Sequence, residues 1–196
     1  MSNINAHSYT TFETAYGTCA IAWNDDAVAC FQLMTDDPKD IERWHKRRVP
    51  QAVLRAPTPI AAKAIDAATR YFNGEPVDFS DIPVDLNEQT DFYKGIYEAL
   101  RRVPYGQTTT YGALAKELGF GNEAARDVGV AMSRNPVPLI IPCHRVLAAG
   151  GHLGGFSTPG GVNSKIRMLK LEGIPIPEPK TAKRKPDQTH SGLFDV

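Results

Sequence analysis

The spacing of apolar residues changes near Thr90, and this change constrains the fold of the 196-residue chain more than any other feature. Residues 9–34 alternate between polar and apolar side chains and are rich in Thr, Tyr, Val, Ile and Phe, which is typical of half-buried strands. From Thr90 onward apolar residues recur at helical spacing. We therefore predict an α+β protein with a small strand-containing N-terminal domain, residues 1–88, and a mostly helical C-terminal domain, residues 89–174.

Turn residues divide the N-terminal part into elements. Asn24-Asp25-Asp26 predicts a hairpin turn between strands at 18–23 and 27–33. One helix is expected to start after Asp37-Pro38 and another to run over 60–72, and residues 77–86 are expected to hold a strand.

The C-terminal part is predicted to form several short helices. Helices are predicted from Thr90 to Pro104, from a Thr110 cap to residue 118, from an Asn122 cap to about residue 133, and over 163–171. The middle two form a helix-turn-helix candidate. In its second helix, three residues are expected to face inward (Ala124, Val128, Ala131) and four to share the other side (Arg126, Gly129, Val130, Ser133). Small residues on that side suit either a DNA backbone or a second helix.

Charge is divided unevenly along the chain although it sums to zero. Residues 1–91 carry 8 basic and 14 acidic side chains, whereas residues 92–175 carry 10 and 5. This division fits a second half that meets a polyanion, and an ordinary solvated surface explains it equally well.

Composition excludes several classes of protein. No apolar run approaches the roughly 20 residues of a membrane helix, and the N-terminus lacks a signal-peptide apolar stretch. The three cysteines include no CxxC pair, which argues against a disulfide framework or a zinc finger, and Cys19 and Cys30 are expected to be buried thiols. We expect a cytoplasmic protein that needs no metal and no cofactor.

Cys143 is the candidate nucleophile. Pro142 favours extended backbone before it, so an apolar run over 137–142 is expected to end as a strand at the cysteine. The positive charge of His144 and Arg145 would lower the thiol pKa and raise its reactivity. Because consecutive side chains point different ways, a contact between Cys143 and His144 needs a bridging water or a turn.

The run Asn135-Pro-Val-Pro-Leu-Ile-Ile-Pro-Cys-His-Arg-Val146, with Val103–Gly106, Thr110-Tyr111 and Ala124-Ala125-Arg126, resembles the O6-alkylguanine-DNA alkyltransferases. The similarity extends from Thr90 to Gly173, whereas residues 13–18 alone resemble the family's ribonuclease-H-like N-terminal domain. The resemblance implies a monomeric DNA repair protein that takes methyl or other alkyl groups from O6 of guanine, and from O4 of thymine, in double-stranded DNA. The acceptor is its own Cys143, irreversibly and once per molecule.

Roles of individual residues follow from the same resemblance. Cys143 would accept the alkyl group, His144 would act through a water as its base, Glu172 would orient the histidine, and Tyr111 would donate to N3 of the leaving guanine. Arg126 would hold the space of the flipped nucleotide. Further DNA contacts would come from Ala124, Ala125, Gly129, Ser133 and Arg145, and the substrate pocket from Asn135, Val146, Phe156 and Ser157.

One motif departs from the family pattern, and two alternative functions stay open. Phe156 stands where the family usually has tyrosine, which puts the placement of Ser157 in doubt. A lesion sensor that flips alkylated guanine without reacting would lack Cys143, and a helix-turn-helix regulator would need an effector module. Residues 175–196 are expected to be disordered, and Leu193 and Phe194 near their end either fold back onto the protein's own surface or contact a sliding clamp.

Overall fold

The structure is a computed structural model, and it describes residues 4–176. Its N-terminal half is a four-stranded sheet with the order β3-β2-β1-β4. β1 (Ser8–Thr14), β2 (Gly17–Trp23) and β3 (Val28–Thr35) are antiparallel neighbours, and β4 (Val53–Leu54) pairs parallel with β1. The predicted hairpin is present, and β1 extends the sheet beyond it.

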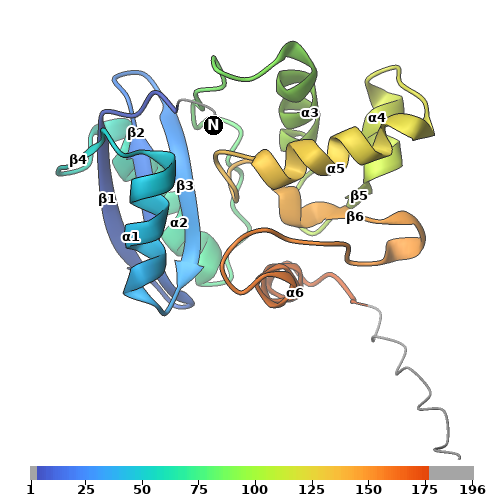
Figure 1. The fold of residues 1–196 in the computed structure, drawn as a ribbon. Coiled ribbons are helices and arrows are strands. Elements are labelled where there is room, and N and C mark those ends of the chain that lie inside the picture. Colours follow the sequence, from blue (N-terminus) through green and yellow to red (C-terminus); the bar gives the residue numbers. More distant parts are fainter. Residues whose placement is uncertain (1–3, 177–196) are drawn as a thin grey trace, which may run out of the picture.

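A helix covers each face of the sheet (Figure 1). α1 (Pro38–Arg48), capped by Asp37, places Trp44 against the small buried residues Ala22 and Cys30. α2 (Pro59–Phe72), capped by Thr58, packs on the other face. Alternation along the strands sends successive side chains to these two cores. This is the mixed α/β half that the sequence predicts.

The C-terminal half is mostly helical. α3 (Asp91–Arg101) and α4 (Tyr111–Glu117) begin where predicted, after Thr90 and the Thr110 cap, because the side chains of these threonines accept from backbone N–H groups of the first turn. The remaining elements are η1 (Asn122–Ala124), α5 (Ala125–Arg134), η2 (Cys143–Arg145), η3 (Ala149–Gly151), α6 (Val162–Leu171) and the short strands β5 (Thr109–Thr110) and β6 (Val146–Leu147).

Three predicted elements differ from the structure. Asn122 starts a 3-10 turn and does not cap α5. Residues 77–86 make only an isolated bridge at Val84, since Pro83 has no N–H for a ladder. The run over 137–142 is a buried turn and not a strand, because Leu139 has φ 81° and the Ile141 N–H donates to the Val137 carbonyl.

Two segments cover the outer edge of β3: residues 77–86, and the chain at Pro136 that leads into the buried turn. The Phe31 N–H donates to the Pro136 carbonyl, and Val28 exchanges backbone hydrogen bonds with Pro83 and Asp85. One buried core then runs from the sheet to α6. The boundary predicted after residue 88 stays a prediction, because that core takes residues from both sides of it.

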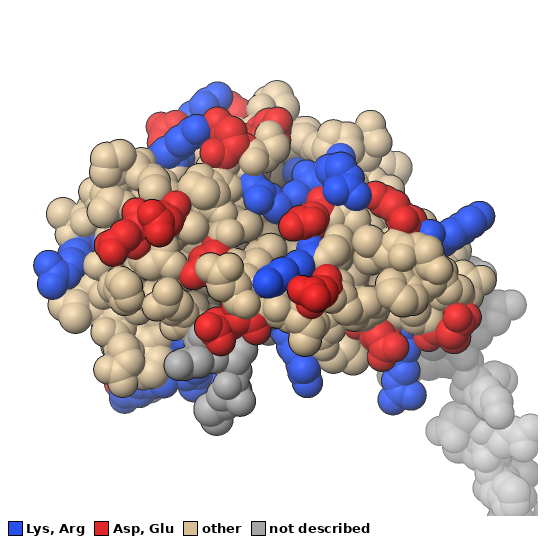
Figure 2. Space-filling model, turned by 90° about the horizontal axis from the view of Figure 1, so that it is seen from above, with Lys and Arg blue, Asp and Glu red and all other residues tan. Residues whose placement is uncertain are grey.

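Charges on the face above α3 alternate in sign. Figure 2 shows acidic and basic side chains side by side there, so the uneven division along the sequence produces no single-sign field on this face. Within residues 4–176, no helix is both long and apolar enough to span a bilayer. Leu193 and Phe194, and the tail expected to be disordered, lie outside the described residues apart from Pro175 and Ile176.

Candidate active site

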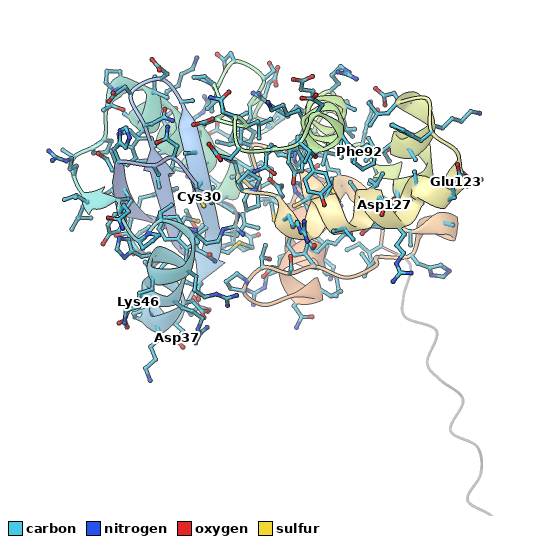
Figure 3. The ribbon with its side chains drawn as sticks, turned by 45° about the horizontal axis from the view of Figure 1, so that its top comes forward. Cys30, Asp37, Lys46, Phe92, Glu123 and Asp127 are labelled. Carbon is cyan, nitrogen blue, oxygen red and sulfur yellow. The ribbon has the colours of Figure 1, made fainter. Side chains whose placement is uncertain are left out.

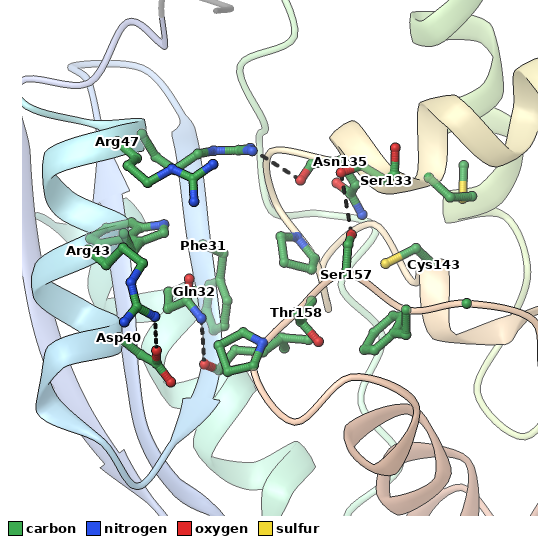
Figure 4. Close-up of a pocket in the computed structure, with 18 of the residues that line it drawn as sticks. Phe31, Gln32, Asp40, Arg43, Arg47, Ser133, Asn135, Cys143, Ser157 and Thr158 are labelled. Atoms are coloured by element: carbon green, nitrogen blue, oxygen red, sulfur yellow. Dashed lines mark hydrogen bonds and ion pairs between the residues drawn. The ribbon is translucent and has the colours of Figure 1, made fainter.

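A cleft of about 820 Å³ separates α1 and β3 from α5 and the loop before α6, and Cys143 faces it (Figure 4). Phe31, Gln32 and three arginines of α1 line one side. The other side carries Tyr111, Asn135 and residues 155–159. The cleft therefore brings together segments that are distant in the sequence around a single thiol.

Cys143 begins η2, where its N–H donates to the Ile141 carbonyl at 2.8 Å. The residue is only 5% exposed. Burial raises the pKa of its thiol, although the Asn135 amide and the Lys165 ammonium act in the opposite direction. The expectation of a lowered thiol pKa is therefore wrong, because burial outweighs the donors and the cation near the sulfur.

His144, which follows the cysteine in η2, forms a buried pair with Glu172. His144 Nε2 lies 2.6 Å from Glu172 Oε1, and since an ionised carboxylate only accepts, Nε2 carries the proton. Burial lowers the pKa of His144, so the ring is neutral. Its Nδ1 makes no hydrogen bond to any described protein group, which leaves that nitrogen as the basic one.

Arg145 turns inward and pairs with the same carboxylate. Its Nε and a terminal nitrogen donate to Glu172 at 3.0 Å, and the other terminal nitrogen donates to the Val103 carbonyl. Burial alone would raise the pKa of Glu172, but hydrogen bonds from His144 and Arg145 lower it to about 2. The side chain of Arg145 is buried and turned toward Glu172, and its predicted contact with DNA stays a prediction.

Tyr111 is the first residue of α4 and lines the cleft half-buried. Burial raises the pKa of its phenol, and the Cys143 sulfur acts in the same direction. The hydroxyl therefore keeps its proton and can donate it. A Cβ placed on Gly154, in the loop before α6, would come within 3.2 Å of this hydroxyl.

The two faces of α5 differ as predicted. Val128 and Ala131 are buried, whereas Arg126, Val130 and Ser133 are exposed, with Ala125 and Gly129 between these extremes. Ala124 is buried, as expected for an inward-facing residue, and its predicted contact with DNA stays a prediction. Figure 3 shows acidic Glu123 and Asp127 at the same end of the helix, which the sequence analysis left out.

The predicted pocket residues lie along the cleft or behind it. Asn135 links α5 to the cysteine turn, since its amide donates to the Ile141 carbonyl and accepts from the Val137 N–H. Phe156 and Ser157 line the cleft, and the Ser157 hydroxyl donates to the Ser133 carbonyl at 3.4 Å. Val146 is buried behind them.

Two residues of this network escaped the sequence analysis. Lys165, fully buried on α6, donates to the carbonyls of Val146 and Leu153, and burial lowers its pKa to about 8. Tyr71 of α2 donates to Glu172. A lysine on the apolar side of a predicted helix was a usable signal for the first, whereas the second becomes visible only in the fold.

Cys19 and Cys30 are both buried free thiols, and both lie away from the cleft. Among the described residues, no group of three or more His, Cys, Asp or Glu side chains is placed to hold a metal ion.

These features define an α+β protein with a helix-turn-helix beside a buried cysteine that a histidine and a glutamate support. Comparisons with known proteins agree with this class. Residues 91–174 match the family model described as the DNA binding domain of 6-O-methylguanine DNA methyltransferase. The chain is 35% identical to the methylated-DNA–protein-cysteine methyltransferase of Haemophilus influenzae, over 91% of this chain and 93% of that one. It is 46% identical to the enzyme of the same name from Methanosarcina acetivorans, over 84% and 97%.

Solved structures agree as well. The Mycobacterium tuberculosis protein OGT in complex with DNA superposes with a TM-score of 0.70 at 32% identity, covering 85% of this chain and 93% of that one. The O6-methylguanine-DNA methyltransferase of Pyrococcus kodakaraensis gives a TM-score of 0.66 at 26% identity, covering 85% and 99%. The chain belongs to the methylated-DNA–protein-cysteine methyltransferase family.

Proposed function

We propose that this chain repairs double-stranded DNA by moving an alkyl group from O6 of guanine to Cys143 Sγ, once per molecule. The observation that carries the proposal is the buried thiol at the cleft, followed directly in the chain by the neutral base His144. O4 of alkylated thymine offers the same kind of carbon–oxygen bond and is proposed as a second substrate.

The transfer is a displacement at the alkyl carbon. The carbon–sulfur bond forms as the carbon–O6 bond breaks, and the thiol proton passes to His144 Nδ1 through a water. Glu172 stabilises the imidazolium that results. Tyr111 donates a proton to the departing guanine and regains one from the imidazolium. The net result is that the guanine gains one proton and loses its alkyl group, while the thiol loses one proton and gains the alkyl group. Water does not readily cleave the resulting thioether, and turnover stops at one.

The exposed face of α5 is proposed to lie against the DNA. An alkyl group on O6 is out of reach inside the base stack, so the nucleotide must leave it. Arg126 is the long exposed side chain on this face, and we assign it the space that the nucleotide vacates. We place the reaction in the cytoplasm, where thiols stay reduced.

Intact mass after incubation with an O6-methylguanine duplex tests the proposal. The wild-type protein should gain the mass of one methylene on Cys143, and Cys143→Ala should gain nothing while retaining DNA binding. Methylation of Cys19 or Cys30 would contradict the assignment. Binding without any mass gain would instead indicate a non-reacting lesion sensor.

A further inference from the structure

Tyr71, from the N-terminal half, lies inside the network that supports the histidine. Its hydroxyl donates to Glu172 Oε1 at 2.8 Å, the oxygen that also accepts from His144 Nε2. It lies 3.4 Å from that nitrogen, and the whole residue is buried. The mechanism above gives Tyr71 no part.

We propose that Tyr71 is a positioning residue that limits how strongly Glu172 holds a proton on His144. The inference rests on the proposed transfer to Cys143. A hydroxyl that donates to a carboxylate oxygen withdraws part of its negative charge, so the oxygen attracts an imidazolium less strongly. His144 then stays neutral at rest and remains available to accept the thiol proton.

The ring and the hydroxyl of Tyr71 have separable roles. The ring packs edge-on against Phe72, Phe79 and Tyr105, at centroid distances of 5.2 to 6.0 Å. A phenylalanine would make these same contacts. The hydroxyl contributes nothing to this packing and would cost stability if buried without a partner, yet it is aimed at the carboxylate.

The groups that face His144 come from three elements. Arg145 of η2 and Lys165 of α6 are cations, and both lower the pKa of His144 in addition to its burial. Glu172, directly after α6, is the anion that raises it. Tyr71 of α2 donates to that anion, and Cys143 precedes the histidine in the chain. Removing the Tyr71 hydroxyl therefore leaves both cations in place and changes only the negative charge on the Glu172 carboxylate.

Tyr71→Phe tests the inference through the pH dependence of alkyl transfer from free O6-benzylguanine, which avoids any titration of DNA binding. Glu172 would hold the His144 proton more strongly in the variant. We expect the midpoint of the acid limb to rise by about 0.5 to 1 pH unit. The rate at pH 6 should fall several-fold, and the rate at pH 8 should change by less than about twofold.

Tyr105→Phe is the matched control. The Tyr105 hydroxyl donates to the Leu171 carbonyl at 2.7 Å, one residue before Glu172. Its loss loosens the same end of α6 without removing a donor to the carboxylate, so the midpoint should stay where it is in the wild type. If Tyr71→Phe does not fold, fluorotyrosine at position 71 keeps the shape, is a stronger donor, and should lower the midpoint.

The outcomes separate the inference from the proposed function. A wild-type protein that takes no alkyl group would contradict the function itself. A wild-type protein that transfers normally, with an unchanged midpoint in both position-71 variants, would overturn the role of Tyr71 alone. An equal midpoint shift in Tyr105→Phe would also overturn it, because general loosening would then be the cause.

Discussion

Glu172 is the shared acceptor of the hydrogen-bond network that holds His144. It accepts from His144 and Tyr71, from two nitrogens of Arg145, and from the Gly106 N–H at 3.1 Å. Because Arg145 is neutralised by this carboxylate, it cannot hold Cys143 as a resting thiolate. The thiol must instead lose its proton as the alkyl carbon arrives, which suits a protein whose acceptor is consumed by each reaction.

Arg126, a single exposed residue, is predicted to raise the rate of transfer from duplex DNA and to leave the rate of transfer from a free base unchanged. Extruding a nucleotide costs a few kcal/mol of stacking, and a side chain in the vacated space offsets part of this cost. Arg126→Ala should slow transfer from duplex O6-methylguanine by at least about tenfold, equivalent to roughly 1.4 kcal/mol. Transfer from free O6-benzylguanine should change by less than about twofold, since a free base needs no extrusion.

Arg134 on the same helix provides the comparison. It is also exposed, but its guanidinium lies 3.4 Å from the Tyr93 hydroxyl and 6.0 Å from the centre of the Tyr93 ring. Arg134→Ala removes the same charge and should leave the ratio of the two rates close to that of the wild type. Equal slowing of both substrates by Arg126→Ala would mean that Arg126 serves the chemistry or the fold.

At the scale of elements, the loop between β6 and α6 depends on glycines with positive φ. Gly154 has φ +66°, and a Cβ there would meet the Tyr111 hydroxyl at 3.2 Å. Gly154→Ala should lower the free energy of unfolding by about 1 kcal/mol through strain. It should also slow transfer several-fold, because it displaces the loop or the phenol that we propose as the donor to the guanine.

Gly151→Ala separates strain from contact. Gly151 has φ +78°, but a Cβ there meets nothing within 4 Å. Urea unfolding should show a similar loss of stability in both variants, whereas single-turnover rates should fall in Gly154→Ala alone. Similar rates in the two variants would show that contact with the Tyr111 hydroxyl does not cause the slower transfer.

Elements with local signals could be predicted from the sequence, and those set by distant partners could not. Thr90 and Thr110 cap α3 and α4 through their own first turns, so nearby residues suffice. The turn before Cys143 depends on Asn135 holding it from the end of α5, and Leu139 adopts a φ that its own sequence disfavours. A proline-rich apolar run alone favours extended backbone, and this explains why a strand was wrongly predicted over 137–142.

The residues of the site also divide into those with local signals in the sequence and those set by distant partners. Cys143, His144 and Arg145 are adjacent in the chain, and their chemistry could be read directly, although the inward turn of Arg145 could not. Tyr71 meets Glu172 across 101 positions, and this contact exists only because α2 packs against the end of α6. Composition and periodicity carry no information about such a pair.

At the scale of the whole molecule, one core joins the two halves and also reaches the site. It includes Trp23 and Leu33 of the sheet, Tyr71 of α2, and Cys143 itself. The N-terminal half is therefore more than a scaffold, since it covers the cysteine turn along β3 and supplies a donor to Glu172. Changes in the sheet should reach the reacting thiol through this shared core.

The same burial predicts how stability depends on alkaline pH. Cys19, Cys30 and Cys143 are all buried, and burial raises the pKa of each thiol above its ordinary value of 9.0. A group whose folded pKa is raised keeps its full contribution below the unfolded pKa and loses it as the pH rises. The free energy of unfolding should therefore fall above about pH 9, by up to roughly 1.4 kcal/mol per pH unit for each thiol. Lys165 acts in the opposite direction between about pH 8 and its ordinary pKa of 10.5, because burial lowers its pKa in the folded protein.

Cys30→Ala isolates one of these contributions away from the cleft. Urea unfolding at half-unit intervals from pH 8 to 10.5 should give a shallower loss of stability in the variant, by about 1.4 kcal/mol per pH unit at the alkaline end. The small cavity left by the sulfur lowers stability equally at every pH, so it moves the whole curve without changing its slope. Parallel curves for wild type and variant would show that the Cys30 thiol ionises as readily in the folded protein as in the unfolded chain. Its burial between β3 and α1 would then be less complete than the structure indicates.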